Sequence, residues 1–174
     1  MIVKLKIDSQ MYADYLAYLF PPNEDGVLMV SSEELMGKLL ISHCRESFRK
    51  TEISEEGIVV TLMMPQCPAT QNLRNKFLYY SAGDMRQLNM ALKAVFELDF
   101  TGYYRKAEGV GFAKKDIVEA FALSRKLITC DCYDALHKRV FRRQQKENSL
   151  LVNKLLRKAY YINETIDLSG LQKV

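Results

Sequence analysis

Tryptophan is missing from this 174-residue sequence, and histidine, proline and glycine are scarce, at 2, 4 and 8 residues. So little proline and glycine excludes a collagen-like or low-complexity chain. Long hydrophobic runs are missing as well, since no stretch approaches the ~18 uncharged apolar residues of a membrane span. Lys4 and Lys6 come too early for a secretory signal peptide. We therefore expect a cytoplasmic protein without a membrane partner.

Cysteine is too sparse for a disulfide framework, because scaffolds that need bridges are usually shorter and much richer in it. The four cysteines are Cys44, Cys67, Cys130 and Cys132. With His137, the Cys130-x-Cys132 pair offers three soft ligands, whereas a structural zinc site needs four. The sequence therefore predicts reduced thiols, no metal site and no cofactor.

Catalytic motifs are also missing. The sequence contains no Walker lysine motif, no H-E-x-x-H and no G-x-S-x-G. Gly109-Val-Gly111 is a G-x-G without the rest of a dinucleotide fingerprint, and His43 and Cys44 are neighbours that diverge by about 100° on a helix. We therefore expect that the protein is not an enzyme.

The first 65 residues alternate between the strand and helix periodicities. Strand patterns occur at residues 2–7, 27–30 and 58–64. Helical spacing occurs at residues 9–20 and 31–48. Ser31 and Glu34 have the spacing of a capping box that would begin the second helix. These patterns predict a small β-α-β-α-β lobe at residues 1–65, built on either a parallel crossover or a mixed sheet.

A helical lobe is expected after a proline-containing polar connector at residues 66–80. Within residues 81–174, helical patterns occur at 81–98, 114–128 and 132–163. Ser81 and Asp84 form another possible capping box, and a connector with Gly102, Gly109 and Gly111 separates the first two helices. The last segment is either one long helix or two joined near residues 147–149. The fold class is therefore α+β.

Charge is distributed unevenly along the chain. Residues 1–100 hold 10 basic and 13 acidic residues, or 10 − 13 = −3, and residues 101–174 hold 15 and 8, or 15 − 8 = +7. The sharpest window is 137–158, with eight bases against the single acid Glu147, so 8 − 1 = +7. The eight bases are Lys138, Arg139, Arg142, Arg143, Lys146, Lys154, Arg157 and Lys158. Such a concentration repels itself, and a polyanionic partner would relieve the repulsion.

On a helical wheel these bases lie opposite an apolar side. From Lys138 to Arg143 they occupy an arc of roughly 140°, away from Leu136 and Val140, which is an amphipathic pattern with a cationic face. The same scheme persists from residue 151 to residue 162. Residues 114–163 consist of a helix, a short link and a basic helix. About 30 residues of this segment resemble the layout of the helix-turn-helix motif.

The leading hypothesis is a non-enzymatic nucleic-acid-binding protein, with DNA favoured over RNA. The eight bases would bind phosphates, and Arg142, at the centre of the arc, is the candidate for reading a base. One alternative is a protein-interaction or assembly module in which the long helix docks onto a partner or onto a second copy, forming a homodimer. The other is a solvated charged face with no partner at all.

Overall fold

The computed structural model describes residues 1–49, 57–66, 70, 76–127 and 130–165. Strands dominate the N-terminal part and helices the C-terminal part, so the α+β class is confirmed. The strands are β1 (Ile2–Ile7), β2 (Leu28–Met29), β3 (Arg45–Ser47), β4 (Ile58–Met63) and β5 (Phe77–Tyr79). The helices are α1 (Gln10–Leu19), α2 (Leu35–Ser42), α3 (Ala82–Val110), α4 (Lys114–Ser124) and α5 (Cys130–Thr165).

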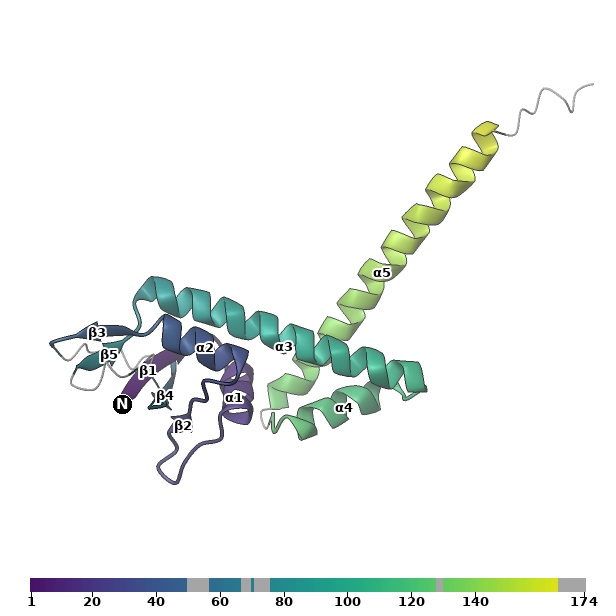
Figure 1. Cartoon of the computed structure of the whole chain (residues 1–174). Helices are drawn as coiled ribbons and strands as arrows, with labels where there is room; N and C mark the ends of the chain where they lie inside the picture. The colour runs from purple at the N-terminus through teal and green to yellow at the C-terminus, as the bar shows by residue number, and fades with distance from the viewer. Residues whose placement is uncertain (50–56, 67–69, 71–75, 128–129, 166–174) are drawn as a thin grey trace, which may run out of the picture. The chain divides into compact units, whose positions relative to one another are not determined.

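The three predicted strands form one mixed sheet in the order β1-β4-β2 (Figure 1). β1 runs antiparallel to β4 with Val3 opposite Leu62, and β2 runs parallel to β4 with Leu28 opposite Leu62. Of the two arrangements left open by the sequence, the mixed sheet is therefore the one that forms. Side chains alternate across it, so Val3 and Leu62 are buried while Lys4 faces outward.

The second predicted helix is shorter than expected at both ends. The Ser31–Glu34 capping box does not form, because the Ser31 hydroxyl accepts the Glu33 N–H at 3.2 Å and Glu34 itself occupies the N-cap position. The helix then ends at Ser42, and the polar segment Arg45–Ser47, expected to be helical, instead forms β3 and pairs antiparallel with β5. β5 lies inside the segment that was expected to be a connector.

The core lies between one face of the sheet and the helices α1 and α3. Leu5 at 0%, Leu16 at 0% and Leu92 at 0% exposure represent the three elements in this layer. Asn89 links α3 to the end of β1: its side-chain amide donates to the Lys6 carbonyl at 2.8 Å and accepts the Asp8 N–H at 3.1 Å. A buried amide with these partners fixes the position of α3 along the sheet.

Helix α3 begins where the sequence predicted and extends twelve residues beyond the expected end near Leu98. The Ser81–Asp84 capping box is confirmed, since the Ser81 hydroxyl accepts the Asp84 N–H at 3.2 Å and Asp84 accepts the Ser81 N–H at 3.0 Å. Gly102 lies inside the helix, not in a connector. The helix ends at Gly111, whose φ of 98° is a left-handed C-cap that favours glycine.

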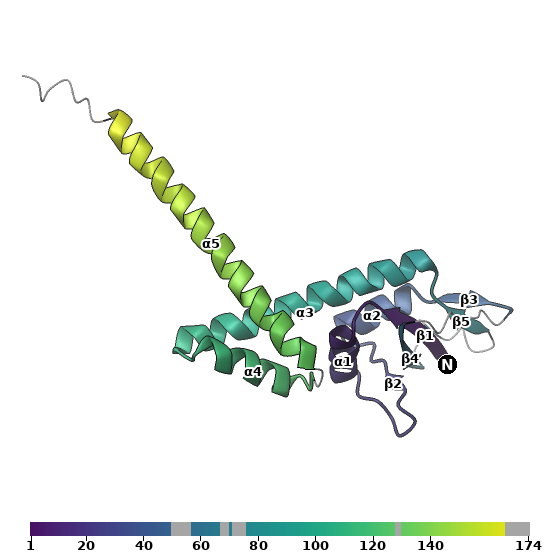
Figure 2. The ribbon, with the colours of Figure 1, turned by 180° about the vertical axis from the view of Figure 1, so that it is seen from behind.

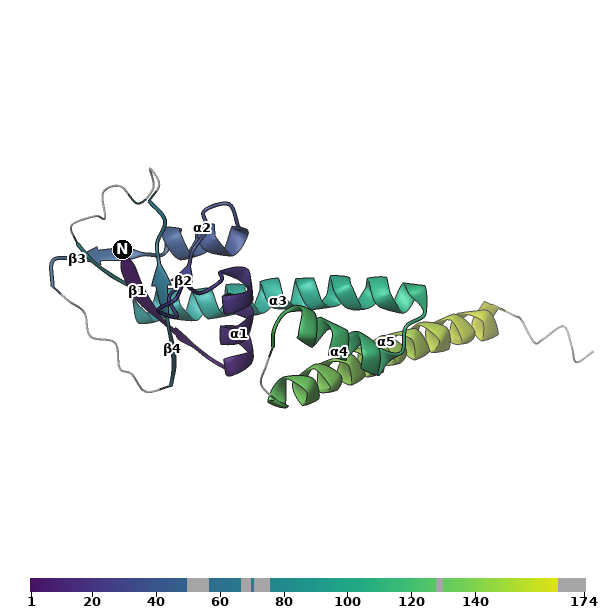
Figure 3. The ribbon, with the colours of Figure 1, turned by 90° about the horizontal axis from the view of Figure 1, so that it is seen from below.

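Helix α4 packs beside the second half of α3 (Figure 3) and ends at Ser124, four residues before its predicted end. Aromatic rings fill this contact: Phe121 lies 5.8 Å from Phe96 and 4.9 Å from Phe100 between ring centroids, both close to edge-on. Leu127 is buried after the helix ends, so the apolar pattern that predicted a longer helix continues into a turn.

Helix α5 is one continuous helix, which decides between the one-helix and two-helix alternatives (Figure 2). The chain separates into two compact units, Met1–Tyr133 and a second from Asp134 onward. The expected division at residues 66–80 stays a prediction, and most of that segment lies outside the described residues. No helix in the described part of the chain is both long and apolar enough to cross a membrane.

Candidate nucleic-acid interface

All eight predicted phosphate-binding residues lie on α5, where a rise of 1.5 Å per residue spreads them over about 30 Å from the first to the last. The six whose side chains are exposed are Lys138, Arg142, Lys146, Lys154, Arg157 and Lys158. Arg139 is half-buried and has an interaction of its own, so it is the least available of the set. Arg143 lies on the helix, and its side chain is outside the described ones.

These bases form two groups along α5. The first runs from Lys138 to Lys146 and the second from Lys154 to Lys158, so the nearest members are eight residues, or about 12 Å, apart. Along one continuous helix at about 100° per residue, the second group is turned around the axis relative to the first, so the exposed bases together span about 200° of the helical wheel. The arrangement is a broken line of positive charge along one rod, which suits a linear polyanion better than a compact anion.

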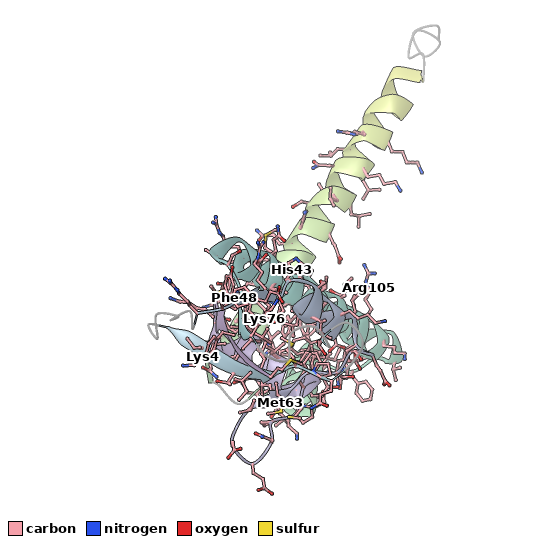
Figure 4. The ribbon with its side chains drawn as sticks, turned by 60° about the vertical axis from the view of Figure 1, so that its left-hand side comes forward. Lys4, His43, Phe48, Met63, Lys76 and Arg105 are labelled. Carbon is pink, nitrogen blue, oxygen red and sulfur yellow. The ribbon has the colours of Figure 1, made fainter. Side chains whose placement is uncertain are left out.

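Three ion pairs among the described residues lie on the unit Met1–Tyr133. Arg45 binds Asp84 at 2.5 Å, Lys76 binds Glu46 at 2.6 Å, and Arg125 binds Asp99 at 2.8 Å. Lys76 also lies 5.2 Å from the ring of the exposed Phe48 (Figure 4). The basic residues in these three ion pairs therefore link helices and strands within Met1–Tyr133.

The side of α5 opposite the bases is apolar and exposed, which the sequence did not predict. Phe141, Leu151, Val152, Leu155 and Leu156 expose 68%, 56%, 52%, 56% and 62% of their surface. We call these five residues the apolar stripe. Amphipathic periodicity shows which residues share a face, but it cannot show whether any other element covers that face.

His43 and Cys44 do not form a nucleophile–base pair. Burial raises the pKa of the Cys44 thiol to about 11, so it stays protonated near neutral pH. The imidazole of His43 is held elsewhere, with Nδ1 2.9 Å from the Leu39 carbonyl and Nε2 3.0 Å from the Gln87 side-chain oxygen. This pair therefore has no activated sulfur.

No group of three or more potential metal ligands occurs among the residues that the structure describes. The side chains of Cys67, Cys130 and Cys132 lie outside that set, so the zinc alternative with His137 is not placed. The expectation of no metal and no cofactor stays a prediction.

Arg125 forms the largest polar cluster that sequence reasoning missed. Its guanidinium binds Asp99 through two hydrogen bonds, Nε at 2.8 Å and a terminal nitrogen at 3.0 Å. It also lies 4.9 Å from the centroid of the Tyr18 ring and 5.5 Å from that of Phe121. The Tyr15 hydroxyl donates to Asp99 at 3.1 Å. These groups join α1, α3 and α4, and their donors and acceptors are used within the fold, so the cluster is structural.

Comparisons with protein-family models, with curated proteins and with solved structures found no match.

Proposed function

We propose that this is a non-enzymatic nucleic-acid-binding protein whose basic α5 arc docks along the phosphates of DNA. One observation carries the proposal: six basic side chains are exposed on one continuous helix that contains one acid between residues 137 and 158. Helices that are only solvated normally mix both signs, because opposite charges four residues apart stabilise the helix. Here the charges repel one another along the helix, and an anionic polymer would remove that repulsion.

The mechanism is electrostatic. Each base that meets a phosphate releases condensed counterions, and the entropy of that release drives binding to any sequence. Arginine is suited to this contact because its planar fork can bind two phosphate oxygens at once. Arg142 is exposed at the centre of the first group and is the candidate for reaching a base edge.

DNA is favoured over RNA because of groove dimensions. The major groove of B-DNA is about 12 Å wide and accepts an α-helix, whereas the major groove of A-form RNA is deep and narrow. The helix-turn-helix resemblance of residues 114–163 points the same way, with α5 as the helix that would enter the groove.

The test is a comparison of two charge-matched double variants. Arg142→Glu with Lys146→Glu removes two exposed bases from α5, and Arg105→Glu with Lys106→Glu removes two exposed bases from α3. Each pair lowers the net charge of the chain from +4 by 4, that is 4 − 4 = 0. If α5 binds phosphates, only the first variant makes the slope of log K against log salt shallower by about 2.

Two results would contradict the proposal. Equal losses in both variants would mean that oligonucleotides sense only net charge. Unchanged duplex affinity in a folded α5 variant would mean that the arc is a solvated face. Substituting Arg142 alone distinguishes its role, since loss of a base-reading residue costs ~1–3 kcal/mol more at the preferred site than at random sequence, where only a phosphate contact is lost.

The assembly module is the second candidate, and the exposed apolar stripe is the observation that favours it. Apolar side chains do not bind phosphates, so the exposure of the apolar stripe on α5 needs a separate explanation.

A further inference from the structure

The apolar stripe has the spacing of a helix–helix seam. The positions 141, 145, 148, 152 and 155 advance by alternating steps of four and three residues; Phe141, Val152 and Leu155 are apolar, and the two positions between them are Gln145 and Asn148. In heptad terms Val152 is an a position, and Phe141 and Leu155 are d positions. Leu151 and Leu156 flank the seam at g and e, and the sequence continues the same spacing at Ala159 and Ile162.

From Phe141 onward, the same register keeps the bases out of the a and d positions. Lys146, Lys154 and Arg157 fall at b, c and f, the outward positions of a two-helix coiled coil. Arg142 and Lys158 flank the seam at e and g, and Lys138 falls at an a position before the stripe begins. Across a parallel pair, Leu151 of one helix meets Leu156 of the other, and Lys158 meets position 163, which is Asn. Between residues 144 and 163, no flanking base is therefore placed opposite another base, so two such helices can pair without bringing their charges together.

We infer that a second copy of this chain covers the apolar stripe, through parallel, in-register pairing of α5 with α5. Two further observations support this occupant. A helix without packing is only marginally stable in water, and every described residue of α5 from 145 to 158 is exposed in the single chain. The pairing is also self-complementary, since each apolar position of the stripe meets an apolar position of the other copy.

The area of the stripe is sufficient for such a contact. At the exposures given above, each of its five side chains offers on the order of 100 Å² of apolar surface. Ten such side chains on two copies bury about 1,000 Å², the lower limit of a specific interface.

This dimer goes beyond the proposed function and does not require nucleic acid. Its salt dependence also has the opposite sign. Two basic helices repel one another at low ionic strength, so salt strengthens their apolar pairing, whereas salt weakens binding to phosphates. The dimer would present two basic arcs on its outside.

Leu155 and Leu150 provide a matched pair of variants. Their exposures are 56% and 60%, but Leu155 lies on the seam and Leu150 falls at f, on the basic side of the wheel. Sedimentation equilibrium of the full chain in about 0.5 M salt, where the Debye length is below ~5 Å, measures the dimer directly. The parent and Leu150→Glu are expected to be dimers, and Leu155→Glu is expected to dissociate at least about 100-fold more readily.

Leu155→Ala separates loss of the seam from loss of the helix, because alanine favours helix more than leucine does. It is expected to weaken the dimer with no loss of α5 helicity in the monomer. A monomeric parent at high salt would overturn the inference, and so would equal effects of Leu150→Glu and Leu155→Glu. A monomer that still shifts DNA would leave the proposed function standing, and a dimer that does not bind DNA would refute that function alone.

Discussion

Removing the Arg125 guanidinium tests whether the polar cluster that joins α1, α3 and α4 contributes to the free energy of unfolding. Arg125→Met keeps an aliphatic side chain beside the rings but removes the cation over the Tyr18 ring and both hydrogen bonds to Asp99. The side chains of Arg125 and Asp99 are 21% and 26% exposed, so neither the surface nor the buried limit applies to them.

The magnitude follows from these exposures. Exposed ion pairs contribute ~0–1 kcal/mol, while breaking a buried pair costs about 3–5 kcal/mol. A mostly buried bidentate pair lies between these values, near 2 kcal/mol, and the stacking of Arg125 over Tyr18 adds about 0.5–1 kcal/mol. The total of about 2.5 kcal/mol corresponds to a fall of roughly 5–10 °C in Tm for a chain of this size.

Urea unfolding of a double-mutant cycle measures the pair itself. The variants are Arg125→Met, Asp99→Asn and both together, with the Lys126→Met variant as a neighbouring exposed control. We expect a coupling free energy of about 1–2 kcal/mol between Arg125 and Asp99. Burial and the neighbouring Asp99 raise the pKa of the Tyr15 hydroxyl, so Tyr15 remains a donor to Asp99 across the accessible pH range. A coupling below about 0.3 kcal/mol, which is within the error of additivity, would refute this account of the cluster.

Three further predictions concern caps, burial and glycine. The Arg45 guanidinium and the Ser81 hydroxyl hold the pKa of Asp84 well below its usual range. The contribution of ionised Asp84 to stability is therefore present above about pH 4 and is lost as the pH falls further. In the Asp84→Asn variant, Tm should depend less on pH in the acid range. Burial raises the pKa of Tyr80, whose hydroxyl donates to the Leu40 carbonyl, so stability falls as the pH rises above about 10. Thermal melts at increasing pH should show a smaller alkaline loss of Tm for Tyr80→Phe than for the parent. Gly102→Ala, with open space around it inside α3, should stabilise by about 0.5–1 kcal/mol, whereas Gly37→Ala would drive its Cβ into the Ser31 carbonyl and lower the urea midpoint; equal midpoints for the two variants would contradict the packing around α2.

Much of the fold could be predicted because its signals are local. β1 was recognised from alternation and β4 from a run of β-branched and apolar residues, and the Ser81–Asp84 capping box gave the first residue of α3 correctly. The Ser31–Glu34 pair has the same spacing and failed, because the Ser31 hydroxyl binds within a turn instead. A capping motif in the sequence is therefore not sufficient for a helix to begin there, and it is not necessary either, since α4 begins after Ala113 with no side-chain cap.

The sequence predicted which basic residues lie on α5, but it did not predict whether the apolar side of that helix is buried. Spacing alone placed the bases from Lys138 to Lys146 on one arc and those from Lys154 to Lys158 on a second, and six of the eight side chains are exposed. That α5 is one helix, which offsets the two arcs around its axis, came only from the structure. The stripe of Phe141 and Leu155 was assigned to an apolar face with the expectation that amphipathic helices bury such a face. Arg125 gave no signal, because its partner Asp99 is 26 residues away in the sequence.

The sequence by itself determined what depends on neighbours along the chain: the alternation of β1, the cap of α3, and the opposition of basic and apolar residues on α5. Tertiary structure alone decided the order β1-β4-β2, the pairing of the polar strands β3 and β5, and the continuation of α3 through Gly102. It also gave the exposure of the five side chains of the apolar stripe on α5. The physical reason is that periodicity and capping are set by residues within a few positions, whereas burial is set by whichever distant segment comes to lie against a face.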